Sequence, residues 1–223
     1  MIRFENLSKS FRTPRGGRKW VARNITATFP SGVSVGLLGR NGAGKSTLLE
    51  LAGGTAKPDG GKVRTRDSIS FPVGFAGSFH PEMTGAQNTR FVARIYGTDT
   101  TSLLAFVAEF AELGPHFHMP VRQYSAGMKS RLAFGISIGI PFDTYLVDEV
   151  TSVGDAAFKE KSRRVFQERM KTAGAIVVSH SMAQIRQLCQ AAAVLERGRL
   201  QVFGDLEEGI ARHQENMGSA GHE

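Results

Sequence analysis

The chain has 223 residues, 41% of them hydrophobic and 22% charged, which is the composition of an ordinary globular protein. This length predicts one α/β domain with a smaller inserted or appended lobe. No stretch approaches the roughly 18 apolar residues of a membrane-spanning helix, and the start, MIRFENLSKS, lacks the apolar core of a secretory signal. The single cysteine, Cys189, excludes an internal disulfide and fits a reducing compartment.

The charge balance is basic, with a formal net charge of +8. This excess permits nucleic acid, an anionic membrane surface or a polyanionic ligand such as a nucleotide as partner. Most Lys and Arg residues are scattered, and the nearest approach to a cluster is Arg12, Arg15, Arg18 and Lys19. A solvated loop between two strands is the ordinary explanation of such a cluster, and a phosphate- or lipid-facing patch is the alternative.

The first part of the chain predicts short strands around one helix. Strands are expected at Ile2–Phe4, Trp20–Phe29 and Val33–Leu38, a helix at Lys45–Ala52, and one or two further strands within Val63–Phe71. A loop with Pro14, Gly16 and Gly17 joins the first two strands, so the chain is expected to open with a hairpin. The pair Gly53-Gly54 ends the helix.

Beyond Phe71 the pattern becomes helical. A loop rich in Gly and Pro, Pro72–Pro81, leads to helical patterns at Gly85–Tyr96 and Ser102–Leu113. We interpret the segment from Gly74 to about Gly139 as a mostly helical lobe that is inserted in the sheet domain.

Strands alternate with helices again from Tyr145 onward. The predicted order is strand Tyr145–Val147, helix Ala156–Lys171, strand Ala175–Val178, helix Met182–Cys189 and strands Ala191–Leu195 and Leu200–Phe203. Such alternation predicts an α/β fold whose sheet contains parallel strands. We expect a single domain over residues 1–214 and a flexible polar tail over residues 215–223.

A phosphate-binding loop is predicted between the strand that ends at Leu38 and the helix that follows. Its sequence, Gly39-Arg40-Asn41-Gly42-Ala43-Gly44-Lys45-Ser46, fits G-x-x-x-x-G-K-[ST]. The glycines let backbone N–H groups turn towards phosphate oxygens at the N-terminus of the helix. Lys45 is expected to reach the β- and γ-phosphates, Ser46 to ligate Mg²⁺, and Thr47 to bond the α-phosphate region. ATP with Mg²⁺ is therefore the predicted ligand.

The second half of a nucleotide site needs a strand that ends in a carboxylate. The run Thr144–Val147 is uncharged and leads into Asp148 and Glu149. Asp148 is expected to hold Mg²⁺ through water, and Glu149 to orient or deprotonate the attacking water. A strand that ends in Asp-Glu is common at protein surfaces, and the phosphate-binding loop gives this one its significance.

Another motif, between the loop and the two acids, resembles the signature of the nucleotide-binding domains of ABC transporters. The segment Tyr124-Ser125-Ala126-Gly127-Met128 stands where that family usually has Leu-Ser-Gly-Gly-Gln, at the start of a helix. The resemblance implies that Ser125 and the Gly127 backbone bind the γ-phosphate of an ATP held by a second copy. Ala126 and Met128 depart from the usual signature, and the methionine removes a polar contact.

Two more residues take their roles from this resemblance, which covers almost the whole chain. His180 follows the apolar run Ala175–Val178 and resembles the switch histidine that contacts the γ-phosphate. Asp155 resembles the key residue of a loop that crosses the dimer interface. The implied fold is a P-loop NTPase core of the ABC type: a mixed sheet with a parallel centre and N-terminal antiparallel strands, with an inserted α-helical lobe.

The adenine contact is left open between two aromatic residues. Phe11 lies where the family places an aromatic side chain that stacks on adenine, and Trp20 is a nearby rival. Such stacking contributes roughly 1–3 kcal/mol, and a core position is the structural alternative for Phe11. The family also has a glutamine where core and lobe join, and its place here falls near Phe75, where this sequence has none.

Further segments resemble the ATPases of polysaccharide exporters, those of capsule and O-antigen systems. These segments are Gly77–Gly85, Asp148-Glu149-Val150 and Val153–Ala156. The sequence ends shortly after Phe203-Gly204-Asp205, which is more like the short capsular form than the O-antigen form with its extra carbohydrate-binding domain.

The resemblance implies a homodimer that sandwiches two ATP·Mg²⁺ and powers an integral membrane permease from the cytoplasmic face of the inner membrane. Export of another polymer, such as O-antigen, is one alternative. Another is a soluble ABC-type ATPase that acts on nucleic acid or the ribosome. The main prediction does not include nucleic acid as a partner. A small-molecule P-loop kinase would leave Tyr124–Met128 and His180 unexplained.

Overall fold

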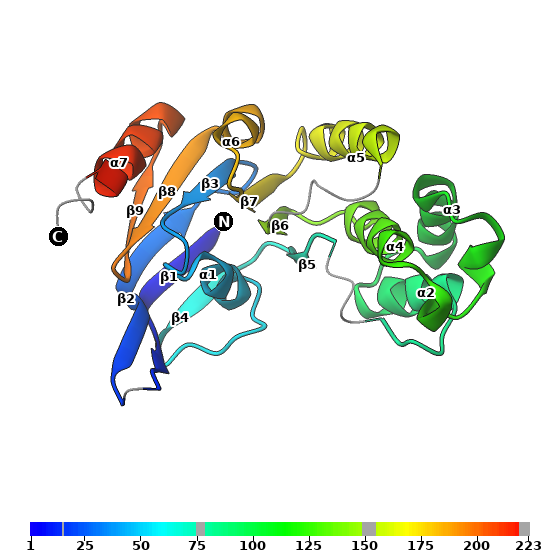
Figure 1. Cartoon of the computed structure of the whole chain (residues 1–223), viewed down its shortest axis with the longest axis horizontal. Helices are drawn as coiled ribbons and strands as arrows, with labels where there is room; N and C mark the ends of the chain where they lie inside the picture. The colour runs from blue at the N-terminus through cyan, green and yellow to red at the C-terminus, as the bar shows by residue number, and fades with distance from the viewer. Residues whose placement is uncertain (15, 75–78, 149–154, 219–223) are drawn as a thin grey trace. The chain divides into compact units, whose positions relative to one another are not determined.

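The computed structural model describes residues 1–14, 16–74, 79–148 and 155–218. These residues form two compact units, whose elements are labelled in Figure 1. The first unit comprises the described residues of Met1–Ile69, Asp143–Glu149 and Met170–Glu223. The second comprises those of Ser70–Phe142 and Val150–Arg169.

Two sheets shape the first unit. Its elements are β1 (Ile2–Arg12), β2 (Arg18–Phe29), β3 (Ser34–Leu38), α1 (Lys45–Ala52), β4 (Gly60–Thr65), β6 (Thr144–Asp148), β7 (Gly174–Val178), α6 (Met182–Leu188), β8 (Ala191–Glu196), β9 (Arg199–Phe203) and α7 (Leu206–Gly218). The smaller sheet, ordered β2-β1-β4, is antiparallel. In the larger sheet, β6-β7-β3-β8 run parallel and β9 pairs antiparallel with β8. The predicted α/β fold, with a mixed sheet and N-terminal antiparallel strands, is confirmed.

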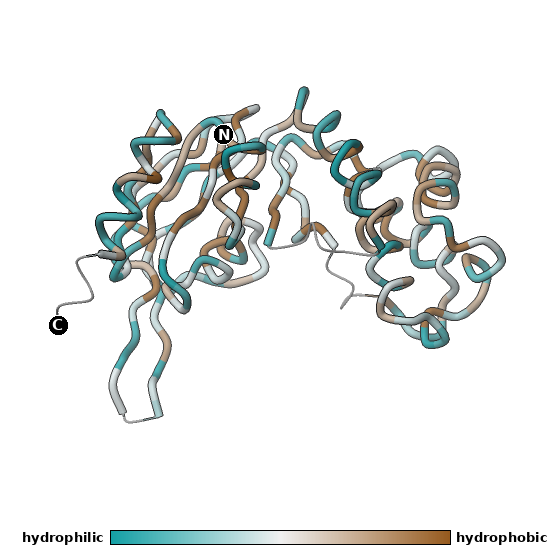
Figure 2. The backbone as a smooth tube through the Cα atoms, turned by 45° about the horizontal axis from the view of Figure 1, so that its top comes forward, coloured by the Kyte–Doolittle hydropathy of each residue, from teal (hydrophilic) through white to brown (hydrophobic). Residues whose placement is uncertain are grey.

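Burial on both faces accounts for the uncharged central strands. All five residues of β3 and all five of β7 are buried, as expected for parallel strands that are covered on each side. The leucines of α1 and Phe4 of β1 join the same hydrophobic cluster. Figure 2 shows hydrophobic residues concentrated along these strands. The core therefore lies between the sheets and α1, directly beneath the loop that precedes that helix.

Strand β1 is longer than the sequence predicts, since it continues past Phe4 to Arg12. The pairing of β1 with β2 shifts register between Phe4 and Leu7, and Asn6 has a φ of 49°. A bulge of this kind adds one residue to a strand. The buried residues of β1 are Ile2, Phe4, Leu7 and Ser10, so a search for strict alternation ends at the bulge.

Helix α7 is an element that the sequence analysis did not predict. Asp205 caps it by accepting a hydrogen bond from the Glu208 N–H at 2.9 Å. Leu206, Ile210 and His213 have the spacing of one helical face, so a signal for the helix is present.

The last turn of α7 overlaps the predicted flexible tail. The tail was placed at 215–223, whereas the helix continues to Gly218 and residues 219–223 lie outside the described residues. Flexibility in this region stays a prediction. The other end of the helix is tied to α6, because the Arg186 guanidinium donates to both carboxylate oxygens of Glu207 at 2.8 and 2.9 Å.

The second unit is mostly helical. Its elements are β5 (Ile69–Pro72) from Ser70 onward, α2 (Gly85–Ile95), α3 (Thr100–Ala111), short 3₁₀ helices at Gly114–His118 and Val121–Gln123, α4 (Ala126–Gly139) and α5 (Ala156–Arg169). A capping box starts α2: the Thr84 hydroxyl accepts from the Gln87 N–H at 3.1 Å, and the Gln87 side chain accepts from the Thr84 N–H at 2.8 Å.

Helix α5 belongs to this unit, although the sequence grouped it with the strands that follow Tyr145. Lys161 donates hydrogen bonds to the backbone carbonyls of Glu109 and Phe110 at 3.3 and 3.0 Å. Phe158 packs edge-on against Phe110, with ring centroids 5.2 Å apart. The end of α3 thus holds α5, a tertiary contact that the alternation of strands and helices does not reveal.

Two observations bear on the exclusions drawn from composition. No helix in the described part of the chain combines the length and apolarity needed to cross a bilayer. Cys189 is buried, 6% exposed, and this burial raises the pKa of its thiol to about 12.

Candidate functional site

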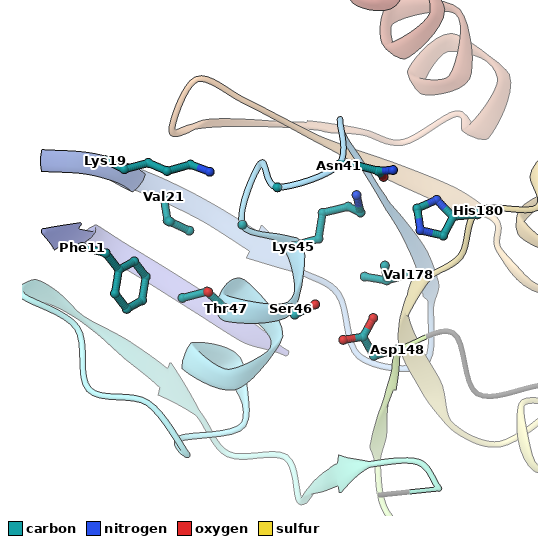
Figure 3. A pocket seen from close by; sticks show the side chains of 12 residues that line it. Phe11, Lys19, Val21, Asn41, Lys45, Ser46, Thr47, Asp148, Val178 and His180 are labelled. Atoms are coloured by element: carbon teal, nitrogen blue, oxygen red, sulfur yellow. The ribbon is translucent and has the colours of Figure 1, made fainter. Parts of the chain in front are cut away.

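Most of the predicted nucleotide-binding residues line one cavity of about 660 Å³ in the first unit (Figure 3). The lining consists of Phe11, Lys19, Val21, Asn41, Gly42, Gly44, Lys45, Ser46, Thr47, Asp148, Val178 and His180. The chain thus brings together residues from β1, β2, the loop before α1, and the ends of β6 and β7.

The loop between β3 and α1 has the conformation that a phosphate cradle requires. Gly44 has a φ of 106°, and a Cβ there would lie 2.1 Å from Cγ1 of Val21. Only glycine satisfies both conditions. Among the described residues no side chain caps α1, and no acidic residue occupies its first turn. The positive end of the helix is therefore suited to a bound anion.

Lys45 links the two sides of this loop. Its ammonium group donates hydrogen bonds to the carbonyl oxygens of Gly39 and Arg40 at 2.8 and 3.1 Å. The same side chain lines the cavity together with Lys19, whereas Asp148 is the carboxylate in the described lining. A lining with two ammonium groups and one carboxylate suits a polyanion such as a triphosphate.

Asp148 and His180 come from the carboxyl ends of neighbouring strands. Asp148 ends β6 and is paired with Val178 of β7, two residues before His180. Strand β3 flanks the other side of β7, so the phosphate loop emerges at the same edge of the sheet. Figure 3 shows Asp148 and His180 at one end of the cavity and Phe11 at the other.

Of the two aromatic candidates for the adenine contact, Phe11 lines the cavity. Its side chain is 47% exposed, and Nζ of Lys9 lies 5.6 Å from the ring centroid. Trp20 is not among the lining residues; the guanidinium of Arg23 lies over its ring at 5.4 Å. The geometry therefore favours Phe11.

Three described residues of the lining were not predicted as nucleotide-binding residues: Lys19, which the sequence placed only in the basic cluster, Val21 and Val178. Lys19 pairs with Phe11 across β1 and β2 and, like Val21 two residues on, belongs to the face of β2 that borders the cavity. This placement supports the phosphate-facing alternative for Lys19. Arg15 of the same basic cluster lies outside the described residues.

Gly39, Arg40 and Ala43 border a second, smaller cavity of about 200 Å³. A Cβ on Gly39 would lie 2.5 Å from the carbonyl oxygen of Leu195, so glycine lets the loop approach β8 closely. The rest of this lining comes from β8, the turn after it, and α7, and includes Glu196, Arg197, His213 and Asn216.

Helix α7 also reaches a third cavity, of about 390 Å³, that borders Lys45 and His180. His213 and Met217 are its contributions to that lining. Burial lowers the pKa of His213, as does the charge of Lys45, while Glu196 acts in the opposite direction. The protonation of His213 on α7 is thus coupled to the charge of Lys45 at the phosphate loop.

The signature segment lies in the second unit, at the start of α4. The Ser125 hydroxyl accepts a hydrogen bond from the Met128 N–H at 3.2 Å, and Ser125, Ala126 and Gly127 are exposed. Tyr124 anchors the segment because its hydroxyl donates to the His116 carbonyl at 2.6 Å. An exposed helix N-terminus is what a phosphate presented by another chain would need.

Asp155 is the cap of α5. Its carboxylate accepts from the Phe158 N–H at 2.9 Å and from the Arg131 guanidinium at 2.8 Å, and the cap bond, followed by the charge of Arg131, lowers its pKa. Arg131 also pairs with Glu112 at 3.6 Å and lies over the Phe158 ring at 4.5 Å. The Asp155 side chain is 65% exposed, and its role at a dimer interface stays a prediction.

Two predicted positions lie outside the described residues: Glu149, the expected catalytic acid, and Phe75, which marks the place of the missing glutamine. The two predicted ligands of Mg²⁺ are described. The Ser46 hydroxyl and the Asp148 carboxylate line the same cavity and are hard oxygen donors. Magnesium ions in such sites take one or two protein ligands and complete their shell with water and phosphate. These residues fit Mg²⁺.

Comparison with known proteins agrees with this geometry. The sequence profile of the ABC transporter family matches residues 22–152. The polysialic acid transport ATP-binding protein KpsT of Escherichia coli is 47% identical over 217 residues, which cover 96% of each chain. The capsule polysaccharide export ATP-binding protein CtrD of Neisseria meningitidis serogroup B is 43% identical over 208 residues, 93% of this chain and 96% of that protein.

Solved structures show the same fold. The dimeric, post-hydrolysis structure of an ATP-binding cassette bound to ADP and Pi matches with a TM-score of 0.74 and 20% identity, covering 90% of this chain and 97% of that one. The profile match, the relatives above 40% identity and the phosphate-binding loop lead to one conclusion. This chain belongs to the ABC transporter family and is an ATP-binding ATPase subunit of the kind found in that family.

Proposed function

We propose that this chain is the ATP-hydrolysing subunit that powers export of a capsular polysaccharide through a separate membrane permease. The observation that carries the proposal is the cavity that unites the phosphate loop with Asp148 and His180. The nature of the cargo is supported by relatives of 43% and 47% identity whose names state capsule polysaccharide export and polysialic acid transport.

ATP binds in this proposal with its triphosphate at the N-terminus of α1. Backbone N–H groups of the loop and the Lys45 ammonium bind phosphate oxygens, and Phe11 stacks on the adenine at the far end of the cavity. Mg²⁺, held by Ser46 and Asp148, would neutralise charge on the β- and γ-phosphates.

Hydrolysis transfers the γ-phosphoryl group to water. Glu149, next to Asp148 in sequence, orients the water and accepts its proton. As the new oxygen–phosphorus bond forms, the bond from the γ-phosphorus to the bridging oxygen breaks, which releases ADP and phosphate. His180 contacts the γ-phosphate and keeps the water in line.

A second copy of the chain completes each site. Ser125 is exposed at the N-terminus of α4, and this exposure supports binding to the γ-phosphate of an ATP held by the partner. Two chains would then enclose two ATP molecules, with Asp155 at the interface. The dimeric state of the structural neighbour supports this arrangement.

Residues 1–214 form one ATPase domain in this proposal, with a helical lobe inserted at about 74–139. The compact second unit, which contains α2, α3 and α4, supports such a lobe. The chain would act at the cytoplasmic face of the inner membrane, as a peripheral partner of the permease. Affinity purification of the chain in mild detergent is expected to recover a protein with several membrane spans. Salt-sensitive recovery of DNA or RNA without such a protein would favour the nucleic-acid alternative.

Glu149→Gln tests the catalytic assignment. We expect the variant to bind ATP with unchanged affinity and to lose turnover by a factor of about 10²–10⁴ or more, because the amide cannot accept the proton. Glu109→Gln is the matched control, since Glu109 is an exposed residue of α3 and the charge change is the same. Normal hydrolysis by the Glu149 variant would contradict the assignment.

A further inference from the structure

A groove of about 800 Å³ borders β2, β8, β9 and α7, and none of the predicted site residues lines it. Its lining consists of Arg23 from β2, Val194, Glu196, Arg197, Arg199, Leu200 and Gln201 from β8, β9 and their turn, and Arg212 and Asn216 from α7. None of these residues lines the nucleotide cavity. The volume is within the roughly 300–1,000 Å³ typical of small-molecule sites.

The charge of this groove is unbalanced. Four arginines face one carboxylate, that of Glu196, within the described lining. Neither Arg23 nor Arg199 forms an ion pair with another described residue, whereas Arg186 nearby on α6 is paired with Glu207 through two hydrogen bonds. Arg212 has a long contact of 3.6 Å to Glu215. Arginines therefore outnumber the carboxylates in the described lining of the groove.

A two-residue hairpin turn between β8 and β9 forms part of the groove. Arg197 has a φ of 46° and Gly198 a φ of 79°, and Glu196 pairs with Arg199 on either side of them. Tight hairpin turns require a positive φ at both central residues, so the turn fixes where the backbone of Arg197 lies. The Gly198 carbonyl accepts from the Arg23 N–H at 2.7 Å, which fixes this turn against β2.

Stacking orients one of the guanidinium groups. The Arg23 group lies 5.4 Å from the ring centroid of Trp20, and a Cβ on Gly198 would lie 3.3 Å from Cγ of Arg23. Three separate elements therefore present arginines to one hollow whose apolar part is Val194 and Leu200. A concave lining of this kind encloses a compact anion better than it follows a flat membrane surface.

We propose that this groove is a second anion-binding site, distinct from the ATP cavity, and that it takes a compound with two or more phosphate groups. Planar guanidinium groups pair with phosphate through parallel hydrogen bonds, and the net charge of the lining requires more than a single negative charge. The groove shares Glu196, Arg197 and Asn216 with the cavity that borders the phosphate loop, so the two hollows adjoin.

Inorganic pyrophosphate is the probe that tests this site. The full chain is first saturated with Mg²⁺ and a non-hydrolysable ATP analogue, so that the nucleotide cavity is closed to the probe. Calorimetric titration is then expected to show saturable binding of one pyrophosphate per chain. The double variant R199Q/R212Q should bind at least about ten-fold more weakly. The matched control R66Q/R90Q removes two exposed arginines outside the groove and should stay within two-fold of wild type.

The remaining outcomes are decisive as well. Absence of saturable binding to wild type, or an equal loss in the control, would overturn the proposal. So would binding to phosphatidylglycerol vesicles that R199Q/R212Q abolishes while free pyrophosphate gives no heat, because the source would then be a lipid surface. Trp20 is the only tryptophan of the chain and reports on the stacked Arg23. Its emission is expected to change with the same midpoint as the heat in wild type, and heat without any change would place the anion elsewhere.

Discussion

Gly209 of α7 is the residue at which the packing of this helix on β8 can be measured. A Cβ on Gly209 would lie 2.3 Å from Cβ of Ala192, where ordinary contact begins at 3.4 Å. The substitution Gly209→Ala therefore forces helix and strand about 1.1 Å apart, the difference of those two distances. Overpacking of this size costs about 1–3 kcal/mol, while alanine in place of glycine inside a helix returns up to about 1 kcal/mol.

Exchanging the two side chains separates these contributions. In an Ala192→Gly background the opposing methyl group is absent, so Gly209→Ala should keep only its favourable helix term. A double-mutant cycle is then expected to give a coupling free energy of about 1–3 kcal/mol between positions 192 and 209. Urea denaturation followed by circular dichroism measures each corner of the cycle. Additive effects, within about 0.5 kcal/mol, would refute the assigned contact.

The same cycle has a functional counterpart. His213 and Met217 lie on the same helix and line the cavity that contains Lys45 and His180. Displacement of α7 by Gly209→Ala should therefore weaken ATP binding, and Ala192→Gly should restore it. Unchanged ATP affinity in the single variant would show that the phosphate loop does not depend on the seating of α7.

Three further outcomes are expected. The pKa of His213 is lowered in the folded chain, so the stabilising contribution of its neutral form is complete above the ordinary pKa of 6.5 and is lost as the pH falls below that value. His213→Gln should therefore flatten the pH dependence of the free energy of unfolding between about pH 5 and 7. An unchanged pH dependence would count against the lowered pKa of His213. Phe11→Ala should raise the Kd of ATP roughly 5- to 150-fold and Trp20→Ala less than about two-fold, and the reverse order would exchange their roles. Arg131→Ala should lower the free energy of unfolding by about 1–3 kcal/mol in urea denaturation, whereas Arg164→Ala, at an exposed position, should lower it by less than about 0.5 kcal/mol. Equal losses would contradict the contacts of Arg131 with Glu112 and Asp155 as a source of stability.

The parts of the site that sequence could predict are those built by a contiguous motif. The phosphate loop needs glycines, a lysine and a hydroxyl at fixed spacing, and each of them is visible in residues 39–47. Asp148 was predicted from an uncharged strand that ends in two acids, and His180 from the resemblance to the ABC family; the pairing of β6 with β7 brings both to the same end of the sheet. Lys19 and Val21 are lining residues without any motif of their own, since their position depends on the pairing of β2 with β1.

Three features that sequence patterns missed have three different physical causes. Strand β1 changes face at the Asn6 bulge, so its alternation of buried and exposed residues is interrupted. Helix α7 has only Gly209 and Ile210 buried, and its polar surface concealed a regular helical spacing. The membership of α5 in the helical unit rests on contacts of Lys161 and Phe158 with α3, which lie about 50 residues away in sequence.

Arg131 has a mechanical consequence for the helical unit. One guanidinium group holds the end of α3 at Glu112, the cap of α5 at Asp155 and the Phe158 ring, and its own backbone is six residues after Ser125 on α4. Ser125 and Asp155 are therefore both attached to one rigid cluster around Arg131. A displacement of the N-terminus of α4 is transmitted directly to the first turn of α5, so the two segments would move together.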